Sequence, residues 1–126
     1  MHRRAGLALL LLALSTSASA AGLSCSIRPA KGTPAAALQN LAKVTQAEAQ
    51  GTALAKIKAA SKKVESSELE VERSCLVYSF DIAVSGKPGF EEILIDAGTG
   101  KVLSHKHESA KQEAAERAKD RAASRK

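Results

Sequence analysis

The sequence contains none of the short motifs that most often carry catalysis. A G-x-S-x-G nucleophile elbow, an H-E-x-x-H zinc motif and a phosphate-binding loop are all missing. The two cysteines also lack the C-x-x-C spacing of a redox-active pair. These absences argue against an enzyme, and we expect neither catalytic residues nor a cofactor.

Apolar runs are also short. The run over residues 5–14 has about half of the ~20 apolar residues that a membrane-spanning helix needs. It follows Arg3 and Arg4 and precedes Ala18-Ser19-Ala20, a small-x-small cleavage pattern, which together indicate an export signal. We predict that residues 1–20 are a signal peptide, cut between Ala20 and Ala21. The mature protein is then expected to be periplasmic or secreted, without a transmembrane segment.

The positive charge of the chain is concentrated at its C-terminal end. The formal net charge is +6, and loss of Arg3 and Arg4 with the signal would leave 17 basic against 13 acidic residues, or +4. Residues 109–126 hold six basic and three acidic residues, which is +3 of that +4. Because the rest of the chain is nearly neutral, the sequence argues against nucleic-acid binding. Weak contact of the basic tail with an anionic surface is the one electrostatic interaction that we still expect.

Cysteine is rare, with only Cys25 and Cys75. In an oxidising compartment an even pair favours one disulfide, which would tie an irregular N-terminal arm to the predicted strands. Two unpaired cysteines are the alternative. A lipid anchor on Cys25 is disfavoured, because Gly22 stands three residues before it, where a lipoprotein signal has leucine.

The first half of the mature chain contains one clear helix start. Residues 21–41 mix proline, glycine and alanine, which predicts a flexible N-terminal arm with a helical turn at 35–41. Thr45 and Glu48 then have the spacing of a capping box. Small and apolar residues follow at helical spacing and predict one apolar helix face: Ala49, Ala53, Ile57 and Ala60.

After residue 63 the apolar period changes from 3.6 to two. Alternation predicts strands over 64–72 and 76–84, and further strands over 90–96 and 101–107. Short turns separate these segments, so we predict an antiparallel meander. The fold class is therefore α+β, with one helix packed on four strands over residues 42–107. Residues 108–126 lack large apolar side chains and are expected to form a charged tail or a solvated helix.

The last predicted turn is the most specific local feature. Gly98 and Gly100 can take positive φ at little steric cost. Asp96 and Thr99 have side chains that can hydrogen-bond the turn backbone. We therefore expect Asp96, Thr99 and Gly100 to hold this hairpin.

Three segments of the chain together resemble the PepSY domain family. The resemblance spans residues 41–105, whereas Cys75, the alanine-rich arm and the charged tail depart from the usual pattern. It rests on a helix opening, a central strand and a closing hairpin: Lys43-Val44-Thr45 with Ala49 and Ala53-Leu54, Leu76-Val77-Tyr78-Ser79-Phe80, and Ile95-Asp96-Ala97 with Thr99-Gly100 and Val102-Leu103.

The resemblance implies a helix on a curved sheet and no known catalytic residues. In the propeptides of secreted metallopeptidases this domain helps to fold and inhibit its own protease. It therefore implies a non-catalytic binding module of the cell envelope whose protein partner is a secreted peptidase. Tyr78 or Phe90 would be an anchor for that partner if exposed, although core packing is the expected role of Phe90.

One short cluster invites a metal-binding interpretation. His105 and His107 share a face of the last predicted strand, and with the carboxylate of Glu108 they would suit zinc or copper. An exposed edge strand does not hold its ligands in place, so we expect a solvated strand end and no metal site. A weak metal-binding periplasmic protein stays open as an alternative.

Other acidic residues are expected to have structural roles. We expect Glu68, Glu70 and Glu72 to form a wet sheet face rather than a calcium site, and Asp81 to pair with a cation of a neighbouring strand. Two functions from different classes remain. One is the binding module, and the other is a small envelope protein whose basic tail contacts anionic lipid or polymer.

Overall fold

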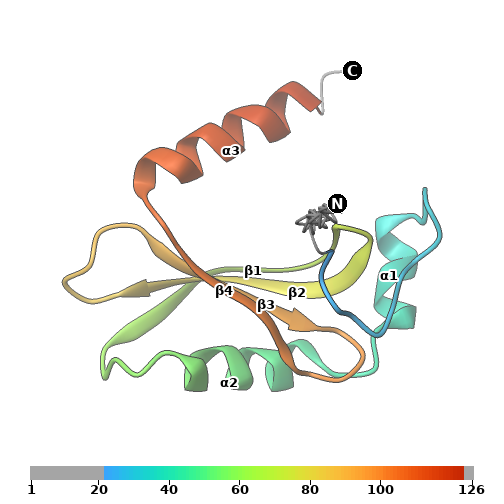
Figure 1. The fold of residues 1–126 in the computed structure, drawn as a ribbon, viewed down its shortest axis with the longest axis horizontal. Helices are drawn as coiled ribbons and strands as arrows, with labels where there is room; N and C mark the ends of the chain where they lie inside the picture. The colour runs from blue at the N-terminus through green and yellow to red at the C-terminus, as the bar shows by residue number, and fades with distance from the viewer. Residues whose placement is uncertain (1–21, 124–126) are drawn as a thin grey trace, which may run out of the picture.

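The computed structural model describes residues 22–123 (Figure 1). The predicted signal peptide and its cleavage site lie outside these residues. The elements run along the chain in the order α1 (Ala35–Leu41), α2 (Gln46–Lys56), β1 (Lys62–Glu72), β2 (Cys75–Val84), β3 (Phe90–Asp96), β4 (Val102–Glu108) and α3 (Ala110–Ala123).

The strands form one antiparallel sheet in the order β1-β2-β3-β4. The predicted α+β class and the four-strand meander are therefore confirmed. The helical turn expected at 35–41 forms as α1, and the tail forms the helix α3, but the expectation that one helix alone packs on the sheet was incomplete. α1 contributes Leu38 to the core, so α2 is not the only helix packed against the sheet.

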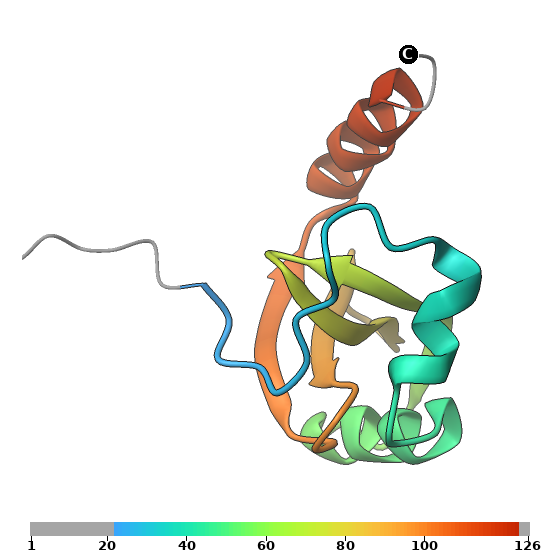
Figure 2. The ribbon, with the colours of Figure 1, turned by 90° about the vertical axis from the view of Figure 1, so that its right-hand side faces the viewer.

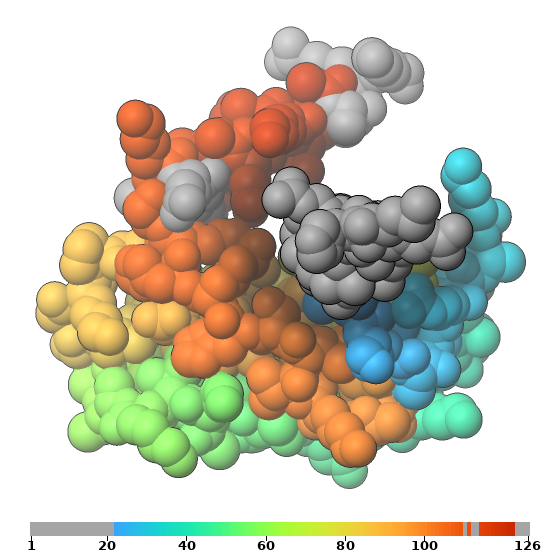
Figure 3. Space-filling model, viewed as in Figure 1, coloured from blue at the N-terminus to red at the C-terminus, as the bar shows by residue number. Residues whose placement is uncertain are grey.

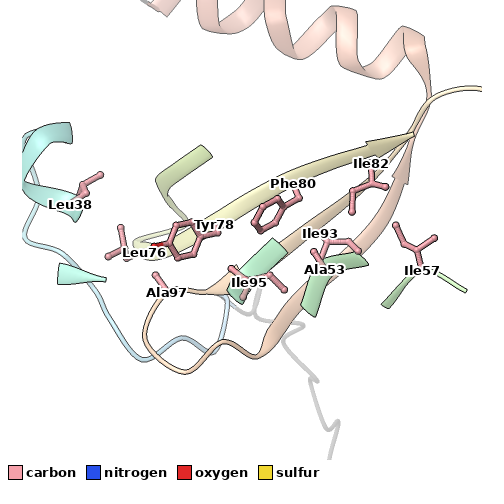
Figure 4. Close-up of a cluster of buried hydrophobic side chains, with 11 residues drawn as sticks. Leu38, Ala53, Ile57, Leu76, Tyr78, Phe80, Ile82, Ile93, Ile95 and Ala97 are labelled. Atoms are coloured by element: carbon pink, nitrogen blue, oxygen red, sulfur yellow. The ribbon is translucent and has the colours of Figure 1, made fainter. Parts of the chain in front are cut away.

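The main core lies between α2 and the sheet face that we call the first face. The predicted capping box is present, since Thr45 Oγ1 accepts from Glu48 N (3.1 Å) and Glu48 Oε2 accepts from Thr45 N (3.0 Å). The small side chains of Ala49 and Ala53 let the helix lie close to the strands. The core side chains come from both layers (Figure 4): Leu38, Ala49, Ala53, Ile57, Leu76, Tyr78, Phe80, Ile82, Ile93, Ile95 and Ala97.

The opposite sheet face, which we call the second face, has a smaller apolar cluster. It consists of Leu23, Cys75, Val77 and Leu94, with Cys25 and Leu103 packed against it. Cys25 and Cys75 form a disulfide, which fits an oxidising compartment. The backbone N–H of Leu76 donates to Ile27 O at 2.9 Å. The expectation of a flexible arm therefore differs from the structure, in which the arm from residue 22 onward packs on the sheet (Figure 2).

The last helix stands apart from both cores. In Figures 1 and 3, α3 rises from the end of β4 on the side of the second face, opposite α2. Its described side chains are exposed. Most of the 108–126 segment is thus a helix. Of the two predicted alternatives, a charged tail or a solvated helix, the structure shows the helix.

The turn between β1 and β2 offers a test of local strain. Arg73 (φ 48°) and Ser74 (φ 68°) both have left-handed backbone conformations that ordinary side chains disfavour. A two-residue turn of this type prefers Asn-Gly. We expect the pair Arg73→Asn and Ser74→Gly to raise the free energy of unfolding by about 1–2 kcal/mol in urea titrations. Ser61→Gly, at an exposed residue without positive φ, is the control and should bring no gain. An unchanged midpoint in the double variant would contradict this account.

Candidate functional site

The turn after β3 is held by the side chain of Asp96, which is 3 % exposed. Its Oδ1 accepts from Gly98 N (2.7 Å) and Ser26 Oγ (2.6 Å), and its Oδ2 accepts from Ser26 N (2.8 Å). Burial raises the pKa of Asp96, but these hydrogen bonds and one from Thr99 N outweigh it and hold the pKa below its usual value. Thr99 Oγ1 in turn accepts from Lys101 N at 3.3 Å. The turn residues singled out in the sequence therefore do lie together.

The two glycines of this turn serve different needs. Gly100 has φ 76°, the left-handed conformation that favours glycine. Gly98 has no positive φ, and a Cβ there would collide with Ser26 Oγ and come within 3.1 Å of Ile27 Cδ1. Gly98 is thus required by the close approach of the N-terminal arm. The sequence did not predict this requirement for glycine, because the arm is about 70 residues away along the chain.

The same turn positions the link between α1 and α2. Ala97 O accepts from Lys43 N (2.9 Å) and Val44 N (3.1 Å), and Tyr78 Oη donates to Val44 O at 2.8 Å. We expected Tyr78 to contact a partner only if it was exposed. It is 5 % exposed, so it does not serve as a partner anchor. Phe90, at the start of β3, is half-buried.

A groove of about 390 Å³ lies beside the outer strand β1. It is lined by one residue of α1, the α1–α2 link, the first residue of α2 and two strand residues: Gln39, Ala42, Lys43, Val44, Thr45, Gln46, Leu69 and Tyr78. The two large exposed hydrophobic residues of the described chain are sequence neighbours of the lining, Leu41 (40 %) next to Ala42 and Val71 (44 %) two residues after Leu69 on β1, and Val71 also lines the acidic hollow beside Glu70 and Glu72. β1 is an outer strand of the sheet. An open backbone edge and exposed apolar side chains therefore occur together here.

The two histidines at the end of β4 share one carboxylate. His105 Nε2 lies 3.0 Å from Glu91 Oε2, and His107 Nδ1 lies 3.3 Å from Glu91 Oε1. Glu91 is directly opposite His107 in the β3–β4 register. Sequence reasoning named Glu108 as the companion carboxylate, and it missed Glu91 because only the register brings Glu91 there. Each histidine nitrogen binds a different oxygen, so the imidazoles flank the carboxylate.

The second face is strongly acidic beyond the small apolar cluster. Burial, followed by the charges of Glu68 and Glu72, raises the pKa of Glu70 to about 7. Burial, followed by the charge of Glu92, raises that of Glu108 to about 7. The expected wet row on β1 is therefore only partly wet, because Glu70 is half-buried.

No family model, curated protein or solved structure matches the chain. The PepSY resemblance therefore stays a prediction carried by the residues quoted above. Within residues 22–123, no helix combines the length and the apolar character needed to cross a membrane.

The role of Asp96 can be tested by Asp96→Asn, which keeps the shape but replaces one acceptor oxygen by an amide group. We expect a loss of about 1.5–3 kcal/mol in the free energy of unfolding, because hydrogen bonds to a charged acceptor are lost. Because the native pKa of Asp96 is lowered, its contribution is present above the unfolded pKa and disappears as the pH falls through the native one. Urea unfolding at pH 7 measures the effect. Asp120→Asn on α3 is the matched control, and equal losses in both variants would refute the assignment.

The raised pKa of Glu70 predicts a pH dependence of stability. The native state favours the neutral carboxyl, so its stabilising effect is full below the unfolded pKa near 4.5 and is lost as the pH rises towards 7. The charges around it are Glu68 and Glu72 on β1 and Glu92 on β3, and the same hollow is lined by Lys106, Glu116, Lys119 and Asp120.

We expect Glu70→Gln to raise the melting temperature at pH 7.5 and to leave it nearly unchanged at pH 4.5, with a chelator present throughout. Glu65→Gln, at an exposed position of the same strand, should behave like the wild type at both pH values. A Glu70→Gln protein whose melting temperature follows the wild type across this range would show that Glu70 is ionised normally.

Proposed function

We propose that the protein is an exported, non-catalytic binding module of the PepSY type, which binds a secreted or envelope peptidase and lowers its activity. The observation that carries this proposal is the groove beside outer strand β1, together with exposed Leu41 and Val71, the sequence neighbours of its lining. The export signal, the disulfide and the PepSY-like segments support the same compartment and class.

Strand addition is the binding mode that this surface favours. An extended segment of the partner can pair with the outer backbone of β1, while alternate side chains point to the two sheet faces. On the first-face side they would meet Leu69 and the groove, whose volume of about 390 Å³ has room for a large side chain. On the other side they would meet Glu68, Glu70 and Glu72, which favours basic residues in the partner.

A second candidate function rests on α3. Its described side chains are exposed and the tail is net basic, which suits contact with anionic lipid or polymer. In this alternative the folded domain serves as a carrier. Salt and a deletion separate the two candidates, because surface attraction of this kind is strongly screened.

Affinity capture from envelope extract, with the oxidised protein as bait at ~150 mM salt, tests the proposal. We expect a peptidase to be recovered, and its activity to fall when pure protein is titrated in. The double variant Leu41→Gln and Val71→Gln should lose most of this binding without a change in melting temperature. The control Ala55→Gln, an exposed apolar position on α2, should retain it.

Deletion of residues 109–126 completes the test. Peptidase binding that survives the deletion supports the binding module. If the bait recovers only anionic lipid or polymer, and salt or the deletion abolishes this, the tail is the functional part and the peptidase proposal is wrong.

A further inference from the structure

Three carboxylates from three adjacent strands converge on the second face. Asp81 on β2 is directly opposite Glu92 on β3, and Glu108 lies on β4. One oxygen from each lies within 4.8 Å of the others. Because Ca²⁺ binds oxygens at about 2.3–2.6 Å, ligands around one ion are separated by up to about 5 Å. Without any rearrangement of the strands, the three oxygens therefore already have the spacing of a common cation site.

The charges of this cluster are not balanced within the described residues. Glu92 is 9 % exposed and Glu108 is 6 % exposed, so two of the three carboxylates are shielded from water. Lys106 Nζ is the cation that forms ion pairs with them, 3.6 Å from Glu92 Oε1 and 3.8 Å from Glu108 Oε1. Lys119 and Glu116 of α3 line the hollow beside them, and their opposite charges offset each other. One ammonium group against three carboxylates leaves a formal charge of about −2 when all are ionised, which is costly in a poorly hydrated site.

A second observation points to a missing ligand. Glu92 Oε1 is buried and has no hydrogen-bond partner among the described residues, and Lys106 Nζ is too distant for a hydrogen bond. Buried carboxylate oxygens in folded proteins are nearly always paired. This oxygen belongs to the residue at the centre of the cluster. By contrast, Asp81 Oδ2 already accepts from Ser66 Oγ (2.9 Å), which orients that carboxylate.

We propose that Asp81, Glu92 and Glu108 form a calcium-binding site on the second face of the sheet, with water completing the coordination. An all-oxygen ligand set favours a hard cation over zinc or copper, which prefer histidine and cysteine. Calcium tolerates irregular geometry, whereas Mg²⁺ demands a near-ideal octahedron. This site is separate from the histidine pair, since His105 and His107 bind Glu91.

Bound calcium would join three strands at the root of α3. Asp81, Glu92 and Glu108 come from β2, β3 and β4, and Glu108 is two residues before α3 begins. An ion there would hold the ends of these strands together and fix the point from which α3 leaves the sheet. The site does not depend on the proposed peptidase partner.

Calorimetric titration of the oxidised, chelator-stripped protein with CaCl₂ at pH 7.5 tests the proposal. We expect one site with a dissociation constant of about 0.1–1 mM, the range of extracellular calcium modules. The melting temperature should be higher in about 5–10 mM calcium than in the presence of a chelator. Glu92→Gln should weaken binding about tenfold or more, because it removes the central charged ligand. Glu68→Gln, exposed on the same face, should change it by no more than about twofold.

Lys106→Gln gives a test in the opposite direction. Removing the ammonium group lowers the repulsion felt by an incoming cation, so binding should tighten several-fold although an ion pair is lost. If Glu92→Gln fails to fold, Asp81→Asn replaces it, since Asp81 is less buried.

Three results would overturn the site. The first is no saturable calcium binding by the folded wild type up to about 10 mM, ten times the weakest affinity expected of such a site. In that case the negative charge is relieved by a proton shared between Glu92 and Glu108. The second is equal weakening by Glu68→Gln and Glu92→Gln, which indicates only a diffuse acidic surface. The third is weaker binding by Lys106→Gln.

Discussion

The buried carboxylate of Asp96 is the interaction on which the arrangement of the chain depends. It is ionised although burial opposes its charge, because N–H and O–H groups of the turn and of Ser26 donate to it. One side chain thereby closes the β3–β4 turn and fixes the N-terminal arm on the second face. The neighbouring carbonyl of Ala97 binds the α1–α2 link. The arm, the α1–α2 link and the sheet therefore meet at a single turn, and the Cys25–Cys75 disulfide also holds the arm on the second face.

The two faces of the sheet have different physical roles. The first face is filled by α2 and by apolar side chains such as Phe80 and Ile93, both fully buried, so most of it stabilises the fold and only its margin at β1 is open, at the groove. The second face is apolar only where the arm covers it. Its other part carries carboxylates and the ammonium group of Lys106, on the side from which α3 rises at the end of β4 (Figure 1). The two binding sites that we propose therefore lie on this charged part and in the groove beside β1.

Much of the fold could be predicted from local patterns. The alternation in residues 64–84 indicates half-buried strands, and the spacing of Thr45 and Glu48 indicates the helix start, because both depend on neighbours a few residues apart. Contacts between distant segments were not predictable in this way. The two cysteines predicted one tie between the arm and the sheet, but the linker-like composition of the arm gave no sign that Leu23 packs against Val77 and Leu94. Whether Tyr78 is exposed to a partner could not be read from the sequence either, because Val44, in the α1–α2 link that covers it, is 34 residues away along the chain.

The sequence by itself determined the element types, the meander and the turn residues Asp96, Thr99 and Gly100, since short-range sterics and hydrogen bonding decide these. Only the tertiary structure decided that Gly98 must be glycine, that Glu91 lies between His105 and His107, and that Glu92 joins Asp81 and Glu108. Each of these depends on strand register or on the approach of a distant segment. A shift of one residue in register would move the strand residues among them to the other face, so their neighbours follow from the pairing of the strands and not from residues near them in the chain.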